Sequence, residues 1–233
     1  RVDRAMRIQA TALFGADLVI QSTRPISEEY SERASSLGLE TARTIEFPSV
    51  VVSGEESTLV QVRAVSFPYP LLGSLETSES LDQQGTATNE PIRHGEIWVE
   101  ATVLHRLNID VGDKVQVGEK DFTVSRVITF TTDSSGNMFQ LAPKVLLPLG
   151  QLASTGLLSP ASRASFRFLA AGGADGIASL QAQLGDELAP SERLQTASDG
   201  RPEVKSALDR ASRFMGLASI LTVILAGAAV ALA

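Results

Sequence analysis

The sequence predicts an α+β domain that continues into a membrane-spanning helix. Strand-like and helix-like patterns, each only a few residues long, alternate along most of the 233 residues. The run from Phe214 to Ala233 contains no charged side chain, and as a helix it would be about 30 Å long, the thickness of a bilayer's hydrocarbon core. The alternative interpretation of this run is the central core helix of a soluble protein.

Composition excludes several classes of function. Hydrophobic residues make up 43% and charged residues 20% of the chain, proportions that are ordinary for a folded domain. The net charge of -7 argues against nucleic-acid binding, which needs a concentrated basic face. The absence of Cys excludes disulfides, thiolate catalysis and Cys-ligated metal. No apolar signal-peptide core follows Arg1 to Arg4, and without an initiator Met we expect a piece of a longer protein.

A helix is expected at each end of the domain. Apolar residues recur at roughly helical spacing over residues 1–14, and Gly15 to Asp17 break that pattern. Near the other end, Pro202 marks a helix start, and an apolar face follows it directly into the uncharged run. That second face consists of Val204, Leu208, Ala211 and Met215. Two such stalks are typical of a domain inserted between two membrane spans.

The residues after the first stalk predict strand, helix, strand and strand. Leu18 to Ile20 form a short apolar strand, and a helix from Glu28 to Leu37 has Ser27 as N-cap and Gly38 as its stop. Two extended segments, 39–52 and 60–65, come next. A proline-containing loop at 67–73 and a polar stretch at 74–91 follow, and the polar stretch is interpreted as a surface loop and a domain boundary.

A second, β-rich module is predicted after this loop. It begins with a strand at 97–99 and a short helix lined by Ala101, Leu104 and Leu107, and residues 115–124 alternate as a β-hairpin. Further strands are expected at 127–131, 144–148 and 165–169, with a polar loop around 133–137. A glycine-rich segment at 172–176 then returns the chain to a helix at 177–188.

No catalytic, cofactor-binding or metal-binding residue is predicted. The chain lacks a phosphate-binding GxxxxGK[ST] loop and the HExxH and GxSxG motifs. His94 and His105 stand far apart without partners at metal-ligand spacing, so both are interpreted as surface positions. The acidic pairs Glu28-Glu29 and Glu55-Glu56 are interpreted as solvated faces. Gly172-Gly173 favours a hinge over a ligand loop, and Trp98 favours the core over a ligand platform.

Several segments together resemble a known permease superfamily. They are GADLVIQS (15–22), LGLETARTIEFPSVV (37–51), VRAVSFPYPLLG (62–73), GEIWVEATVLHRLNIDVGDKVQVGEKDFTVSRVI (95–128) and RPEVKSALDRASRF (201–214). In this order and spacing they are similar to the outer domain of FtsX/MacB-superfamily ABC transporter permeases, and more narrowly to the YbbP-like branch.

The resemblance implies a porter-like α/β sandwich that is split by an inserted β-rich, Sabre-like module. Stalk helices would flank it, and a transmembrane helix would end it. The implied divisions are a stalk helix at 1–14, the first porter-like half at 15–89, the Sabre-like insertion at 90–171, the second porter-like half at 172–200, and the stalk and transmembrane helix at 201–233.

The resemblance also implies a non-catalytic function. The domain would lie on the periplasmic or extracellular side of the bacterial cytoplasmic membrane and couple the motion of a separate cytoplasmic ATPase to transport or mechanotransmission. Implied partners are that ATPase, the lipid bilayer, a second permease half, and an extracytoplasmic substrate or protein; no cofactor and no nucleic acid are implied. Two alternatives stay open: a passive membrane-anchored adhesion or scaffold domain, and a membrane-anchored hydrolase.

Overall fold

A computed structural model describes residues 15–132, 142–159, 162–185 and 187–196 of the chain. The predicted stalk at 1–14, the polar loop around Asp133, and the predicted stalk and transmembrane helix at 201–233 lie outside these residues. None of the helices within the described ranges has the length and apolarity that a membrane crossing requires.

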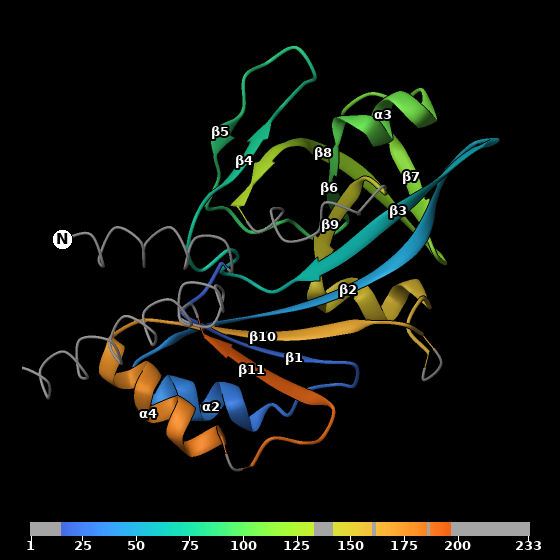
Figure 1. The fold of residues 1–233 in the computed structure, drawn as a ribbon. Coiled ribbons are helices and arrows are strands. Elements are labelled where there is room, and N and C mark those ends of the chain that lie inside the picture. Colours follow the sequence, from blue (N-terminus) through green and yellow to red (C-terminus); the bar gives the residue numbers. More distant parts are fainter. Residues whose placement is uncertain (1–14, 133–141, 160–161, 186, 197–233) are drawn as a thin grey trace, which may run out of the picture. The chain divides into compact units, whose positions relative to one another are not determined.

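The first and last strands of the described chain lie in a four-stranded antiparallel layer, in the order β11-β1-β10-β2. Two helices, α2 and α4, lie side by side on one face of this layer (Figure 1). The elements are β1 (Leu18–Ser22), α2 (Glu29–Ser36), β2 (Glu40–Ser53), β10 (Ser165–Ala171), α4 (Ala174–Gly185) and β11 (Glu192–Thr196). With β1-α2-β2 and β10-α4-β11 as its halves, the layer has the split βαβ arrangement.

Alternation along β1 explains why this layer is buried on both faces. Leu18 and Ile20 point toward the helices and pack with Phe168 and Leu180, all fully buried. Val19 points to the opposite face and packs there with further buried residues, Ala16, Ala42 and Leu169. Because successive side chains of a strand alternate between faces, a continuous apolar run such as LVI indicates a central strand.

The longest strand, β2, connects this layer to a closed β-barrel. Its first half pairs with β10, and its second half belongs to a ring of six strands in the order β2-β3-β9-β6-β8-β7. Pairing of Val51 with Val117 joins β7 back to β2 and closes the ring, which leaves no free edge within it. The additional strands are β3 (Glu56–Val65), β6 (Glu96–Glu100), β7 (Lys114–Val117), β8 (Lys120–Thr131) and β9 (Lys144–Pro148).

Apolar side chains fill the inside of the barrel. Phe122 is 1% exposed, and Val62, Ile97 and Val124 around it are fully buried. The helix α3 (Ala101–Leu107) adds Leu104 and its neighbours to the same cluster, and a 3₁₀ helix, η2 (Leu149–Thr155), adds Leu152. The barrel is therefore a packed core, in which a deleted side chain leaves a cavity.

Most elements expected from the sequence are confirmed, and the α+β class is confirmed with them. The predicted helix at 28–37 is α2. Its N-cap is Glu28 instead of the predicted Ser27, whose hydroxyl accepts a hydrogen bond of 3.3 Å from the Glu29 N–H. Gly38 follows α2 with a φ of 71°, as a C-terminal stop should. β11 and η2 are among the elements that were not predicted: in ERLQT only Leu194 is apolar, and a 3₁₀ turn has no strong sequence period.

The interpretation of residues 74–91 as a surface loop was wrong in part. Two strands, β4 (Leu75–Ser78) and β5 (Thr86–Ala87), form there, and β4 extends the sheet beyond β8. The hydroxyls of Thr77 and Thr88 are buried and 2.6 Å apart. Polar residues can be buried when they hydrogen-bond one another, so polarity alone did not distinguish this segment from an exposed loop.

Gly118, in the turn between β7 and β8, is expected to tolerate no side chain. Its φ is 64°, and an added Cβ would overlap the Thr155 carbonyl oxygen. We therefore expect Gly118→Ala to lower the free energy of unfolding by at least about 2 kcal/mol, through left-handed strain and overpacking. Urea unfolding followed by Trp98 fluorescence measures this.

The matched control is Gly54→Ala in the β2–β3 turn, where φ is 58° but an added Cβ meets nothing within 4 Å. That variant is expected to lose only the strain, about 1 kcal/mol. Equal losses for the two variants would show that the contact with Thr155 is unimportant.

Candidate functional site

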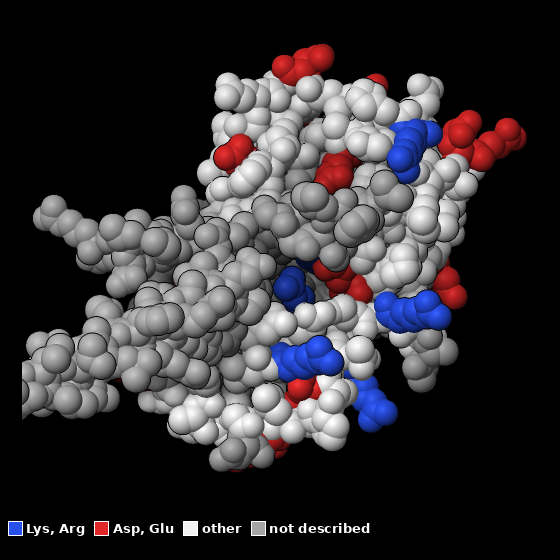
Figure 2. All heavy atoms as spheres, viewed as in Figure 1, with Lys and Arg blue, Asp and Glu red and all other residues white. Residues whose placement is uncertain are grey.

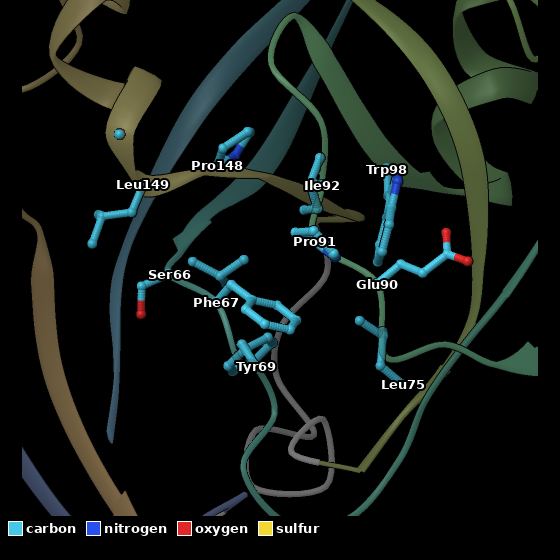
Figure 3. Close-up of a pocket in the computed structure, with 12 residues that line it drawn as sticks. Ser66, Phe67, Tyr69, Leu75, Glu90, Pro91, Ile92, Trp98, Pro148 and Leu149 are labelled. Carbon is cyan, nitrogen blue, oxygen red and sulfur yellow. The ribbon is translucent and has the colours of Figure 1, made fainter. Parts of the chain in front are cut away.

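The candidate site is a pocket with a volume of about 340 Å³ beside the barrel (Figure 3). Its wall comes from the end of β3 and the following loop, from β4, from the segment before β6, from β6 itself, and from the β9–η2 junction. The lining residues are Val65, Ser66, Phe67, Tyr69, Leu75, Glu90, Pro91, Ile92, Trp98, Pro148, Leu149 and Gly150. Rings, prolines and branched aliphatic side chains dominate this wall.

Three aromatic side chains line the pocket from different depths. Trp98, on the central strand β6, is 3% exposed and packs against Leu75 and Ile128. Phe67 is 61% exposed, and its ring lies beside Tyr69 and below Pro91 (Figure 3). The two rings at 67 and 69 come from the proline-containing loop, whose prolines keep it from forming a strand.

The hydroxyl of Tyr69 is held by a buried ion pair between Arg63 and Glu46. Arg63 donates a 2.6 Å hydrogen bond to the Tyr69 hydroxyl and lies 3.0 Å from a carboxylate oxygen of Glu46. The Arg63 and Glu46 side chains are 5% and 11% exposed and face each other directly across β2 and β3. In such a position each charge needs its partner, so the pair holds the phenol in one orientation.

Trp98 is supported in a similar way by Arg126 of β8. The guanidinium carbon lies 5.6 Å from the indole centroid, a cation–π distance. The same guanidinium donates a 2.8 Å hydrogen bond to Glu90 and longer ones to Thr77 and Thr88. The carboxylate at the pocket rim is therefore neutralised, and the segment from β4 to β6 is attached to β8.

Three polar side chains of the wall, Ser66, Tyr69 and Glu90, have partners within the fold. Ser66 accepts a 2.8 Å hydrogen bond from the Arg43 N–H, Tyr69 accepts from Arg63, and Glu90 accepts from Arg126. Within the described ranges, no group of three acidic or His residues could hold a metal ion. Chemically, the arrangement offers apolar contact surface and no activated nucleophile or general base.

A second pocket, of about 280 Å³, lies where the barrel meets the antiparallel layer. Arg43 dominates it, with a 2.6 Å ion pair to Glu28 and hydrogen bonds to the Ile26 and Ser27 carbonyl oxygens. These contacts fix the loop before α2 against β2. Since the guanidinium is fully engaged within the fold, we regard this pocket as structural.

Comparison with known proteins gives one curated relative and several structural ones. The chain is 26% identical over 234 residues to the uncharacterized ABC transporter permease YbbP of Escherichia coli (strain K12), a match that covers 100% of this chain and 28% of YbbP. No protein-family model matches. The chain thus spans about a quarter of the length of the curated relative.

Solved outer domains of two other transporters have the same fold. The extracellular domain of YknZ, a noncanonic ABC-type transporter from Gram-positive bacteria, matches with a TM-score of 0.51 and 11% identity, over 77% of this chain and 100% of that one. The periplasmic region of MacB from Actinobacillus actinomycetemcomitans matches with a TM-score of 0.50 and 12% identity, over 84% and 95%. The resemblance to the extracytoplasmic domain of FtsX/MacB-superfamily permeases is confirmed.

The residues singled out from the sequence do not line the pocket, with one exception. His94, His105 and the acidic pairs at 28–29 and 55–56 are all exposed. Gly172 and Gly173 are also exposed, between β10 and α4, and their role as a hinge stays a prediction. Trp98 is in the core, as predicted, and also lines the pocket.

The sequence analysis missed the rest of the pocket. The signal was present in FPYP, where two aromatic residues alternate with prolines in a loop, so that no strand or helix buries both rings. The distribution of charge does not point to the pocket, because acidic and basic side chains both occur over the face seen in Figure 2. Only the fold brings this loop next to Trp98.

A shifted pKa lies away from the pocket, at Tyr30 of α2. Burial, reinforced by a 2.8 Å hydrogen bond to the Glu192 carboxylate, raises the pKa of Tyr30 to about 12. Because the folded-state pKa lies above the unfolded value of about 10, the contribution of Tyr30 to stability is complete below pH 10 and is lost as pH rises through 12.

We expect Tyr30→Phe to remove the contribution of this residue to the fall in the free energy of unfolding between about pH 10 and 12. Tyrosinate absorbance of a Tyr69→Phe background reports Tyr30 alone, because the chain has two tyrosines. A Tyr30 that titrates near pH 10 in the folded protein would contradict the prediction.

Proposed function

We propose that this chain is a non-catalytic extracytoplasmic domain of an ABC transporter permease, which couples the motion of a partner ATPase to transport or mechanotransmission outside the membrane. The observation that supports it best is the match to YbbP over the whole chain. The fold shared with the outer domains of YknZ and MacB supports the same class of domain.

The sheet offers a mechanical connection for this coupling. β1 begins four residues after the predicted first stalk at 1–14, and β11 ends shortly before the predicted second stalk at 201–233. The two strands are hydrogen-bonded neighbours, with Leu18 opposite Thr196. Movement of either stalk would therefore pull on one of two neighbouring strands of the antiparallel layer.

β2 would transmit that load to the barrel, because one continuous strand of 14 residues pairs with β10 at one end and with β7 at the other. We propose that the antiparallel layer is the porter-like part and that the Sabre-like insertion supplies β6, β7, β8 and β9 of the barrel, which β3 and the second half of β2 complete. Since β10 pairs with β1 and β2, its pairing favours an insertion that ends before Ser165 instead of after Ala171.

The proposed partners follow from this function. The permease would pair with a cytoplasmic ATP-hydrolysing subunit through parts outside this chain and work with a second permease half. The domain would lie on the periplasmic or extracellular side of the bacterial cytoplasmic membrane, with residues 201–233 as stalk and transmembrane helix. An extracytoplasmic substrate or protein would be its target.

Topology in intact cells tests the location. Single Cys residues at Gln83 and Glu55, both exposed, are expected to react with a membrane-impermeant thiol reagent. Ser78→Cys is the matched control from the same segment as Gln83: its side chain is 5% exposed and should react only after denaturation. Protection of both exposed sites until the cells are lysed would place the domain in the cytoplasm and overturn the proposal.

A proline in the second stalk tests the coupling. We expect Leu208→Pro to abolish ATP-dependent activity of the assembled transporter while the outer domain stays folded, because a proline inside a helix costs roughly 3 kcal/mol and kinks it. Leu208→Ala, which keeps a helix former at that position, is the control. Normal ATP-dependent activity of a correctly inserted Leu208→Pro variant would favour a passive scaffold instead.

A further inference from the structure

We propose that the pocket beside Trp98 binds the alkyl chain of a small, uncharged amphiphile. The inference rests on the proposed function, because it assigns the chemical class of an extracytoplasmic substrate to a place in this domain. Its volume of about 340 Å³ lies at the low end of the range for small-molecule sites, which suits one chain and not a folded partner.

The charged groups at the pocket favour an uncharged ligand. Among the described residues that line the pocket, only Glu90 carries a formal charge, and Arg126 compensates it at 2.8 Å. A cationic ligand would meet Arg126 next to that carboxylate, and an anionic ligand would meet the carboxylate itself. A ligand without charge avoids both costs of desolvation.

The composition of the wall favours a hydrocarbon as the bound part. Rings, prolines and aliphatic side chains form most of the surface, and Ser66, Tyr69 and Glu90 each accept a hydrogen bond from within the fold. An alkyl chain forfeits no hydrogen bond on entering, and its free rotation lets it follow a surface of rings, prolines and aliphatic side chains.

The pocket is also preorganised for binding, because two of its rings are already held in place. Arg63 holds Tyr69 and Arg126 holds Trp98, so two of the three rings lose little freedom when a ligand arrives. Phe67 is the third ring, and 61% of it is exposed to water without a ligand. Covering its face removes apolar surface from water, which supplies much of the expected affinity.

The single tryptophan of the chain lines this pocket and serves as a built-in reporter. The test uses the 233-residue chain in lipid nanodiscs whose scaffold protein lacks tryptophan, titrated with a decanol that has a terminal bromine, which quenches tryptophan on contact. We expect saturable quenching of Trp98. Phe67→Ser should weaken the apparent affinity about tenfold, the equivalent of one well-covered apolar side chain.

The matched control is Phe130→Ser, which removes an equally large ring that is 49% exposed and outside the pocket wall. It should leave the affinity unchanged. Both substitutions lie at exposed positions, so the fold is expected to tolerate them. Quenching that rises without saturation and is the same in both variants would reflect partition into the bilayer and would overturn the proposal.

Two further probes test the chemical class. Bromoalkyl carboxylate and bromoalkyl trimethylammonium ions of the same length should bind more weakly than the alcohol, and tighter binding of either ion would overturn the neutral assignment. Binding of a bromobenzyl alcohol without binding of the bromodecanol would overturn the alkyl assignment. Failure of all probes would remove the ligand site and leave the coupling function standing, since Leu208→Pro tests that function separately.

Discussion

Glu46→Gln is expected to lower the free energy of unfolding by roughly 3 kcal/mol, near the lower end of the range for breaking a buried ion pair. The substitution leaves the Arg63 guanidinium, 5% exposed, without its compensating charge 3.0 Å away. The amide oxygen can still accept a hydrogen bond, which keeps the loss from being larger. Urea unfolding, followed by the fluorescence of Trp98, measures the effect.

Glu90→Gln is the matched control, because Glu90 also accepts a hydrogen bond from an arginine but is 63% exposed. Its loss should be at most about 1 kcal/mol, as for surface ion pairs. In addition, Glu46→Gln should weaken binding of the brominated alcohol, since Arg63 also orients Tyr69. Equal losses in the two variants would show that burial of the Arg63–Glu46 pair is energetically unimportant.

Phe122→Ala is expected to lower the free energy of unfolding by about 3–5 kcal/mol, the cost of deleting a fully packed aromatic ring. Phe122 is 1% exposed and lies in the cluster that fills the barrel. Because the ring of strands is closed, its side chains have little room to collapse into the cavity, which favours the upper part of that range.

Phe130→Ala provides the control on the same strand, β8, where the ring is 49% exposed. We expect a change within about 0.5 kcal/mol for this variant. Urea unfolding of both variants decides the comparison. A loss of less than 1.5 kcal/mol for Phe122→Ala would mean that the barrel core rearranges freely, contrary to a tightly packed ring.

Local patterns predicted most of the elements but not their pairing. The alternation in Val115 to Val124 predicted the β7–β8 hairpin, and Gly38 marked the end of α2. These are short-range effects, set by side-chain direction and capping within a few residues. β11 was not predicted because its sequence, ERLQT, has no alternating apolar residues. It forms by pairing with β1, which is far away in the chain.

The Arg63–Glu46 ion pair could not be predicted from local patterns either. Glu46 and Arg63 lie in two predicted extended segments, yet nothing local sets their register. The hairpin turn at Gly54 fixes that register and places the two residues opposite each other. Register determines which side chains share a face, so a shift by one residue would have separated this pair.

The sequence by itself determined the α+β class, the resemblance to an outer domain of FtsX/MacB-superfamily permeases, and the core position of Trp98. The tertiary structure alone decided that β2 belongs to two layers, that 75–78 is a buried strand, and that Phe67, Tyr69 and Trp98 line one pocket. The physical reason is the separation along the chain of the residues that interact. Helix caps, turns and alternation involve residues a few positions apart, whereas barrel closure and pocket formation depend on contacts between residues that are far apart in the chain.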